Sequence, residues 1–186
     1  MINTEKTEKI EETENKRNTS LIFIDWPNIR HAEINKLKKK IDYIGLIQFL
    51  FPNKDEKLIV TLYYTSIEKE GVLFKQLPNK LRENFQALVG PDFILVELDK
   101  DVDSKMINDM WFKFVEDLEN NSLPKKITLF SGDHCFACYL GKATRSGIET
   151  TVVAEEGSCA EILKEVSTRT IFLSDFLIKY PELVKT

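Results

Sequence analysis

The stretch "KITLFSGDHCFACYLGKATRSGIETTVVAE", residues 126–155, decides the fold class of this chain. Its first part, residues 126–133, is a short apolar run typical of a buried strand, and residues 149–155 form a second run of this kind. The stretch between them, residues 136–147, ends at Gly147, and glycine is favoured just after a helix. Strand, helix and strand in succession predict two parallel strands joined by a helix that packs on the sheet.

The same alternation extends over most of the chain. Further strands are predicted at residues 21–25, 57–66, 93–98 and, as a short sixth, 170–175. Helices are predicted at residues 42–51, 72–89 (two helices broken at Pro78), 103–119, 158–167 and 174–180. Apolar runs without two-residue alternation indicate strands covered on both faces. We therefore expect an α/β fold, a three-layer sandwich with a mostly parallel central sheet of about five or six strands and right-handed crossovers.

Length and composition fit one soluble globular domain. The chain has 186 residues, 42% of them hydrophobic and 30% charged, and a formal net charge of −4. Residues 1–18 are charged and poor in apolar side chains, so we expect a mobile arm before a single domain at residues 19–186. No signal peptide or membrane span is expected, and an odd cysteine count of three favours the reducing cytoplasm.

Acidic residues stand where the predicted strands end. Asp25 and Asp133 close two of these strands, and Asp103 and Asp109 follow a third. Ligand sites of parallel sheets form at the carboxyl ends of strands, and clustered carboxylates repel one another unless a cation such as Mg²⁺ or Mn²⁺ offsets their charge. Helix capping is the other interpretation, because aspartate is a favoured first residue and both Asp103 and Asp133 lie at strand-to-helix junctions.

Three motifs resemble those of one known family. "FIDWPNIR" (23–30) resembles the "FIDGxN" start of NYN domains, which form the LabA-like group of the PIN-like nuclease superfamily. "KDVDSKMINDM" (100–110) resembles their "KGVDVxLxxDM" segment, and residues 129–154 resemble "SGDSDFxPLxxxxxxxGxxVxV". The order and spacing of the motifs agree from Leu21 to the C-terminal "SDFL".

The resemblance implies a PIN-like fold and a metal-dependent ribonuclease-like domain that hydrolyses RNA phosphodiester bonds. It implies a Mg²⁺ or Mn²⁺ site held by Asp25, Asp103 and Asp133. The catalytic residues that it implies are Asp25, Asn28, Asp103, Asp109 and Asp133.

The sequence departs from the family pattern at two positions. Trp26 replaces a glycine, so its side chain either fills that space or stacks on a base. Cys135 replaces the second aspartate of "SGDSDF", and a thiol is a poor ligand for Mg²⁺. Two functions therefore stay open: a divergent metal-dependent ribonuclease, or a catalytically weak or inactive NYN domain that binds RNA or a protein as a regulatory module. A haloacid-type phosphatase is disfavoured, because Pro27 stands where its second aspartate would be.

Cys135 and Cys138 have the spacing of a zinc or redox pair. A structural zinc site needs about four ligands, and only His134, His31 and Cys159 are on offer besides the pair. We expect the spacing to be accidental, although a redox dithiol at the start of a helix stays open.

RNA contacts would need a local basic patch, since the chain as a whole is acidic. The candidates are Arg30, Lys38, Lys39, Lys40, Lys105, Lys142 and Arg145. The alternative is that the run at residues 36–40 is only a solvated loop or helix end. The sequence leaves the oligomeric state and any protein partner open.

Overall fold

A computed structural model of the protein describes residues 18–65, 79–99 and 102–185. Most of the predicted N-terminal arm and the part of the predicted helix pair up to Pro78 lie outside the described residues.

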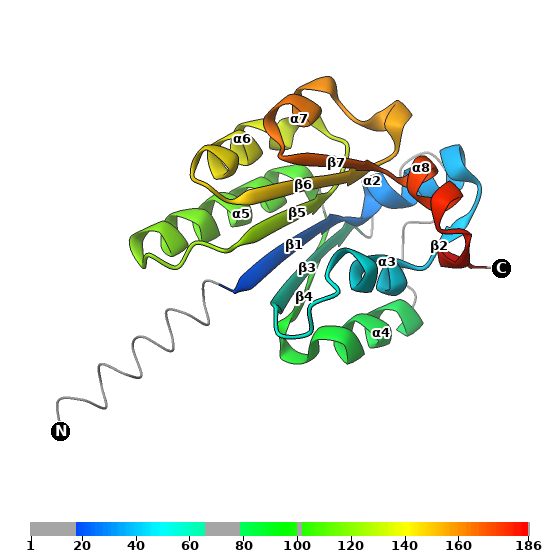
Figure 1. Ribbon diagram of the computed structural model, residues 1–186, viewed down its shortest axis with the longest axis horizontal. Coiled ribbons are helices and arrows are strands. Elements are labelled where there is room, and N and C mark those ends of the chain that lie inside the picture. The colour runs from blue at the N-terminus through cyan, green and yellow to red at the C-terminus, as the bar shows by residue number, and fades with distance from the viewer. Residues whose placement is uncertain (1–17, 66–78, 100–101, 186) are drawn as a thin grey trace.

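Six parallel strands form the central sheet of the described protein (Figure 1). They are β1 (Thr19–Asp25), β3 (Lys57–Thr65), β4 (Phe93–Leu98), β5 (Lys126–Phe130), β6 (Glu149–Ala154) and β7 (Arg169–Phe172). Their order across the sheet is β4-β3-β1-β5-β6-β7, and every pairing is parallel. A separate antiparallel pair joins β2 (Lys40–Ile41) to β8 (Val184–Lys185). The predicted fold class is thus confirmed.

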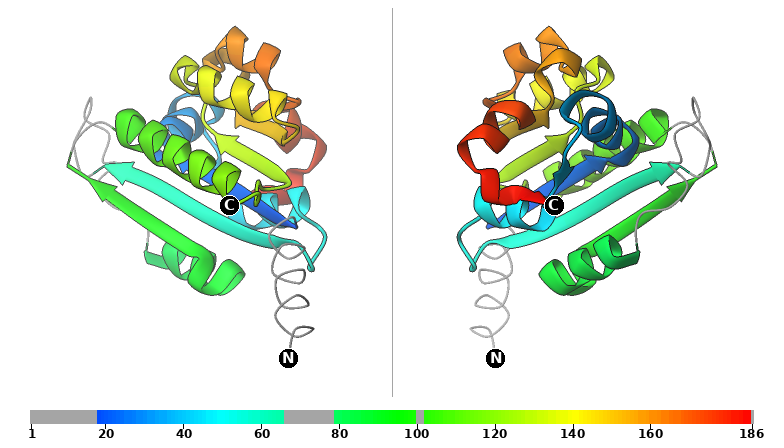
Figure 2. Two further views of the ribbon diagram at one scale, coloured as in Figure 1. Left: turned by 90° about the vertical axis from the view of Figure 1, so that its left-hand side faces the viewer. Right: turned by 90° about the vertical axis from the view of Figure 1, so that its right-hand side faces the viewer.

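Helices cover both faces of this sheet, as Figure 2 shows for α4 and α5. One face carries α2 (Trp26–His31), α3 (Tyr43–Leu50), α4 (Asn79–Val89) and α8 (Leu173–Lys179). The other face carries α5 (Val102–Glu119), α6 (Ala137–Arg145) and α7 (Glu161–Val166). The described residues also form short helical turns: η1 (Ala32–Leu37), η2 (Gly90–Asp92), η3 (His134–Phe136), η4 (Glu156–Ser158) and η5 (Pro181–Leu183).

Strand β1 contributes to both hydrophobic cores because successive side chains point to opposite faces. Ile22 and Ile24 lie in the core beneath α3, whereas Leu21 and Phe23 lie in the core beneath α5 and α6. A strand buried on both faces needs apolar residues at every position, and this is why residues 21–24 form a continuous apolar run.

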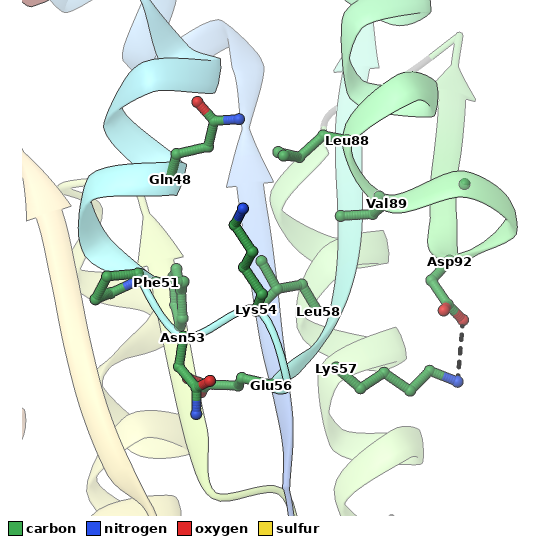
Figure 3. A pocket seen from close by; sticks show the side chains of 12 residues that line it. Gln48, Phe51, Asn53, Lys54, Glu56, Lys57, Leu58, Leu88, Val89 and Asp92 are labelled. Carbon is green, nitrogen blue, oxygen red and sulfur yellow. Dashed lines mark ion pairs between the residues drawn. The ribbon is translucent and has the colours of Figure 1, made fainter.

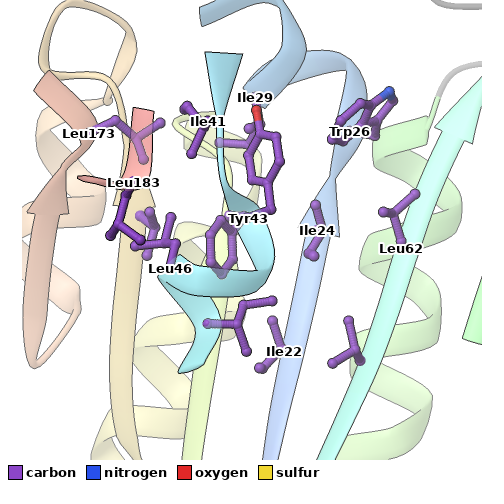
Figure 4. Close-up of a cluster of buried hydrophobic side chains, with 14 of the residues drawn as sticks. Ile22, Ile24, Trp26, Ile29, Ile41, Tyr43, Leu46, Leu62, Leu173 and Leu183 are labelled. Atoms are coloured by element: carbon purple, nitrogen blue, oxygen red, sulfur yellow. The ribbon is translucent and has the colours of Figure 1, made fainter. Parts of the chain in front are cut away.

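Trp26 belongs to the first of these cores (Figure 4). Its side chain is only 3% exposed, and its ring centroid lies 5.3 Å from that of Tyr43 in an edge-to-face arrangement. Trp26 therefore fills core space, and it offers no surface on which a base could stack.

The residues after β1 form the helix α2, for which the sequence analysis predicted no element. Asp25 caps α2, since its Oδ1 accepts a hydrogen bond from the backbone N–H of Asn28 at 3.2 Å. Pro27 is tolerated there because the first backbone N–H groups of a helix have no partner within it.

Candidate metal centre

The carboxyl ends of β1 and β5 meet at the point where the strand order reverses. Ile24 pairs with Phe130, and the residues that follow them, Asp25 and Ser131, are linked by their side chains. The Ser131 hydroxyl donates to Asp25 Oδ2 at 2.8 Å and accepts from the backbone N–H of Asp133 at 3.2 Å. Ser131 is fully buried and thus holds the two aspartates in one arrangement. No motif in the sequence marks this serine, and its only signal is its place directly after a buried strand.

Asn28 and Gly132 form a second link between the same two segments. The backbone N–H of Gly132 donates to Asn28 Oδ1 at 3.1 Å. The carbonyl of Gly132 accepts from the backbone N–H of Ala160 at 2.9 Å, which draws the segment around η4 against it. A Cβ atom on Gly132 would lie 2.2 Å from the carbonyl oxygen of Ser158, so this close approach requires glycine.

Asp25 is enclosed by the protein and is 3% exposed. Its burial raises the pKa of the carboxyl group from 3.8 to about 7. The hydrogen bond from Ser131 and that from Asn28 oppose this rise, whereas the negative charges of Asp103 and Asp133 add to it. Near neutral pH, Asp25 is therefore stabilised either by a proton or by a nearby cation.

Three other side chains converge beside Asp25. One ligand atom each of Asp103, Asp133 and Cys135 lies within 4.8 Å of the other two. Asp103 lies in the first turn of α5, and Asp133 caps η3 by accepting from the backbone N–H of Cys135 at 3.0 Å. Burial, followed by the charges of Asp133 and Asp103, raises the pKa of the Cys135 thiol well above its usual range.

The donor set of this group combines two hard carboxylates with one soft sulfur. The carboxylates fit the divalent cation that the family resemblance implies, and the thiol fits Mg²⁺ poorly. Asp103 and Asp133 are the residues that would hold such an ion, and Asp25 lies beside them rather than within the group.

Asp109 stands apart from the group that the structure brings together. It lies six residues after Asp103, about 9 Å further along α5. Its Oδ2 accepts from the Tyr63 hydroxyl at 3.2 Å, and its Oδ1 pairs with Lys105. Both Asp109 and Lys105 are thus engaged with other protein groups.

The basic candidates divide between the two edges of the sheet. Arg30 lies on α2 and pairs with the buried carboxylate of Glu33. Exposed Lys38, Lys39 and Lys40 follow η1, on the side of the sheet where α2 and α8 begin (Figure 1). Exposed Lys142 and Arg145 lie in the last turns of α6, which runs from the acidic edge towards the start of β6. The structure therefore separates Lys142 and Arg145 from the acidic side chains.

Cys135 and Cys138 have different surroundings in the described structure. Cys135 lies with the carboxylates, whereas Cys138 is exposed and is not part of that group. His134 is largely exposed, and its Nδ1 lies 3.0 Å from Asp133 Oδ1.

A pocket of about 520 Å³ lies at the opposite edge of the sheet (Figure 3). It lies between the ends of α3 and α4, with Phe51, Leu58 and Leu88 among its apolar walls. An ion pair of 3.2 Å between Lys57 and Asp92 borders it. Because β3 and β4 start here, the pocket is separate from the acidic group at their other ends.

Comparison with solved structures supports the fold. The chain is similar to a protein of unknown function, VPA0982, from Vibrio parahaemolyticus, with a TM-score of 0.60, 13% sequence identity, and coverage of 91% of this chain and 98% of that chain. A weaker similarity, with a TM-score of 0.33 and 14% identity, covers 84% of this chain and 52% of a ferredoxin-NADP⁺ reductase from Plasmodium falciparum. Among curated proteins, none matches this chain.

The parallel α/β sheet with acidic side chains at its switch point is consistent with a PIN-like fold. The sequence matches the NYN domain over residues 19–174, and the chain belongs to the NYN domain family. At the level of the family, this membership indicates a nuclease-like function related to RNA. Within the described part of the chain, no helix has both the length and the apolar character needed to cross a membrane.

Proposed function

We propose that this NYN domain is a divergent metal-dependent ribonuclease that hydrolyses phosphodiester bonds in RNA. The observation that carries the proposal is the convergence of Asp103, Asp133 and Cys135 at the sheet's switch point, in direct electrostatic range of buried Asp25. The cation expected from the family is Mg²⁺ or Mn²⁺. When bound, such an ion polarises a phosphate and lowers the pKa of a bound water.

The protein's own residues have separate tasks in this proposal. Asp103 and Asp133 supply carboxylate ligands, and the enclosed charge of Asp25 increases the attraction for a cation. Asn28 and Ser131 keep the segments after β1 and β5 in register through their hydrogen bonds. Asn28 is therefore a positioning residue through Gly132.

RNA would approach from the side on which Lys38, Lys39 and Lys40 are exposed. Their charges supply the local positive field that an acidic chain otherwise lacks. Lys142 and Arg145 lie further along α6, in its last turns, and would meet RNA only beyond the acidic group.

The test is cleavage of a labelled single-stranded RNA with and without Mn²⁺. Asp103→Asn should abolish metal-dependent cleavage, and Asp55→Asn, in an exposed turn at the opposite edge, should not change it. Asp109→Asn tests whether Asp109 takes part in catalysis. Its position apart from the acidic group predicts a small effect on cleavage, whereas a direct catalytic role predicts loss of activity. Cleavage that survives both EDTA and Asp103→Asn would disprove the proposal.

One observation favours a second candidate, a regulatory module that binds RNA without cutting it. Cys135 stands in the acidic group, where the family pattern has a carboxylate, and one fewer charge weakens the hold on a hard cation. This candidate predicts RNA binding that is unchanged by EDTA and by Asp103→Asn, together with no cleavage under either condition.

A further inference from the structure

We infer that Cys135 makes this site selective for thiophilic divalent ions, of which Zn²⁺ and Co²⁺ are the clearest cases, over Mg²⁺. The inference deepens the proposed function, and it rests on that proposal only for the position of the centre. It concerns which ion the chain's own donor set prefers, whether or not RNA is cut.

The geometry places the sulfur among the ligands. The Cys135 sulfur lies within 4.8 Å of a carboxylate oxygen of both Asp103 and Asp133. Zn²⁺ binds sulfur at about 2.3 Å and oxygen at about 2.0–2.2 Å, so tetrahedral neighbours are roughly 3.5 Å apart. Shifts of about 1 Å would bring the three atoms to that spacing.

A short turn keeps Asp133 and Cys135 on the same side. The backbone N–H of Cys135 donates to Asp133 Oδ1 at 3.0 Å. This bond fixes the position of Cys135 relative to Asp133, two residues earlier in the sequence. The turn is anchored by the buried hydroxyl of Ser131, which accepts from the backbone N–H of Asp133. The sulfur is thus positioned by the same contacts that position the carboxylate.

The number of donors also favours such an ion. Catalytic zinc centres have three protein ligands and leave one position for water or substrate, and Asp103, Asp133 and Cys135 are three. Mg²⁺ instead takes six oxygen ligands and gains nothing from sulfur. The charge of enclosed Asp25 favours any dication, so the selectivity comes from Cys135.

Binding exchanges one proton for the ion. The S–H bond of Cys135 breaks, a metal–sulfur bond forms, and the proton passes to the solvent. No oxidant or reductant takes part. All three cysteines are free, so no disulfide competes for this sulfur.

The test uses Co²⁺ as a spectroscopic probe of the full chain after treatment with EDTA. Titration should produce a sulfur-to-cobalt charge-transfer band that saturates at one ion per chain. Cys135→Ser should abolish the band, and Cys138→Ser, three residues further on and exposed, should keep it. Thermal unfolding of both metal-free variants checks that neither has lost the fold.

Calorimetry then compares Zn²⁺ with Mg²⁺. Zn²⁺ should bind wild-type protein at least about 100-fold more tightly, and Cys135→Asp should reduce this preference by about 10-fold or more. A missing band, or equal Zn²⁺ affinity in wild type and Cys135→Ser, overturns the inference. Loss of the band in Cys138→Ser also overturns it, since the cysteine pair would then be the ligand.

The two proposals fail in different ways. Co²⁺ binding through Cys135 without any RNA cleavage would refute the ribonuclease function and leave the inference intact. Cleavage that Mg²⁺ supports equally well in wild type and Cys135→Ser, with no sulfur band, would refute the inference and leave the function intact.

Discussion

Asp25→Asn should make the metal-free protein more stable at alkaline pH. The substitution keeps the size of the buried side chain and removes its charge, in a place where Asp103 and Asp133 add repulsion. Because the folded protein holds the pKa of Asp25 above its unfolded value, the contribution of this group to stability is fully present below pH 3.8 and is lost as the pH rises to about 7.

The magnitude follows from the size of the shift. A rise from 3.8 to about 7 corresponds to about 4 kcal/mol of lost stability above pH 8. At pH 5, where the unfolded chain is already ionised and the folded one is not, the loss is about 2 kcal/mol. The amide introduced by the substitution also gives up part of the hydrogen bonding with Ser131, about 1 kcal/mol at every pH. The stability difference between Asp25→Asn and wild type should therefore change by about 2–3 kcal/mol between pH 5 and pH 8.5, and the lost hydrogen bond does not affect this change.

The assay is urea unfolding in EDTA at both pH values, followed by the tryptophan fluorescence of Trp26 and Trp111. The stability of Asp25→Asn relative to wild type should increase from pH 5 to pH 8.5, and Asp55→Asn should show no such increase. A divalent ion at about a hundred times its dissociation constant should add about 2.7 kcal/mol to the wild type and less to Asp25→Asn. A difference between Asp25→Asn and wild type that is the same at both pH values would refute the reasoning, because Asp25 would then ionise as in the unfolded chain.

Three other substitutions test the surroundings of the site. Gly132→Ala should lower the free energy of unfolding by about 2–3 kcal/mol, since its Cβ meets a backbone carbonyl, whereas Gly157→Ala meets nothing within 4 Å and should change it little; equal melting temperatures for the two variants would contradict this. Trp26→Ala should cost about 3–5 kcal/mol in urea unfolding and should not increase RNA cleavage, because Trp26 lies in the core. Replacing Lys38 and Lys39 by glutamine should weaken RNA binding and reduce the salt dependence, measured by fluorescence anisotropy, by about 0.7 per lost phosphate contact. An unchanged salt slope would place the RNA elsewhere.

Strands proved to be the most predictable part of the fold. The predicted strand at residues 93–98 matches β4, and that at residues 57–66 matches β3 as far as Thr65, the last described residue of that segment. The strand predicted at residues 126–133 is too long, since β5 ends at Phe130. Residues 131–133 leave the sheet, because the backbone N–H of Gly132 donates to the side chain of Asn28 rather than to a backbone carbonyl of a neighbouring strand, and the Ser131 hydroxyl bonds to the Asp25 carboxylate. Such bonds join residues about a hundred positions apart, and no local pattern encodes them.

Helix α2 was missed for a different reason. Proline suggests a turn in most contexts, yet in the first turn of a helix it costs no hydrogen bond. The strands β2 and β8 have only two residues each, which is too short for hydrophobic periodicity to indicate a strand in the sequence.

Positions in the site were predictable only where a strand end fixed them. Asp25 is the last residue of β1 and Asp133 comes three residues after the end of β5, and the structure places both at one edge. Beyond the first turn of a helix, the position of a side chain depends on the direction of the helix axis, and the sequence does not show that direction. Lys142 is accordingly close to Asp133 in the sequence and lies towards the other edge in space. The sequence also could not show whether the Trp26 side chain points into the core or to the surface, because tryptophan is favoured both in cores and in surfaces that bind bases.

The position of β1 in the middle of the sheet bears on how the protein folds. Asp25 and Ser131 are 106 residues apart, so the centre exists only after β5 has docked beside β1. Strands β1 and β3 can pair long before that, which leaves one side of β1 as an open edge during synthesis. Pairing over such separations is slow, because a long loop must close before any contact rewards it. We expect docking of β5 to be the late step of folding. A nascent chain that ends before Lys126 should therefore bind chaperones and should not bind metal ions at this centre.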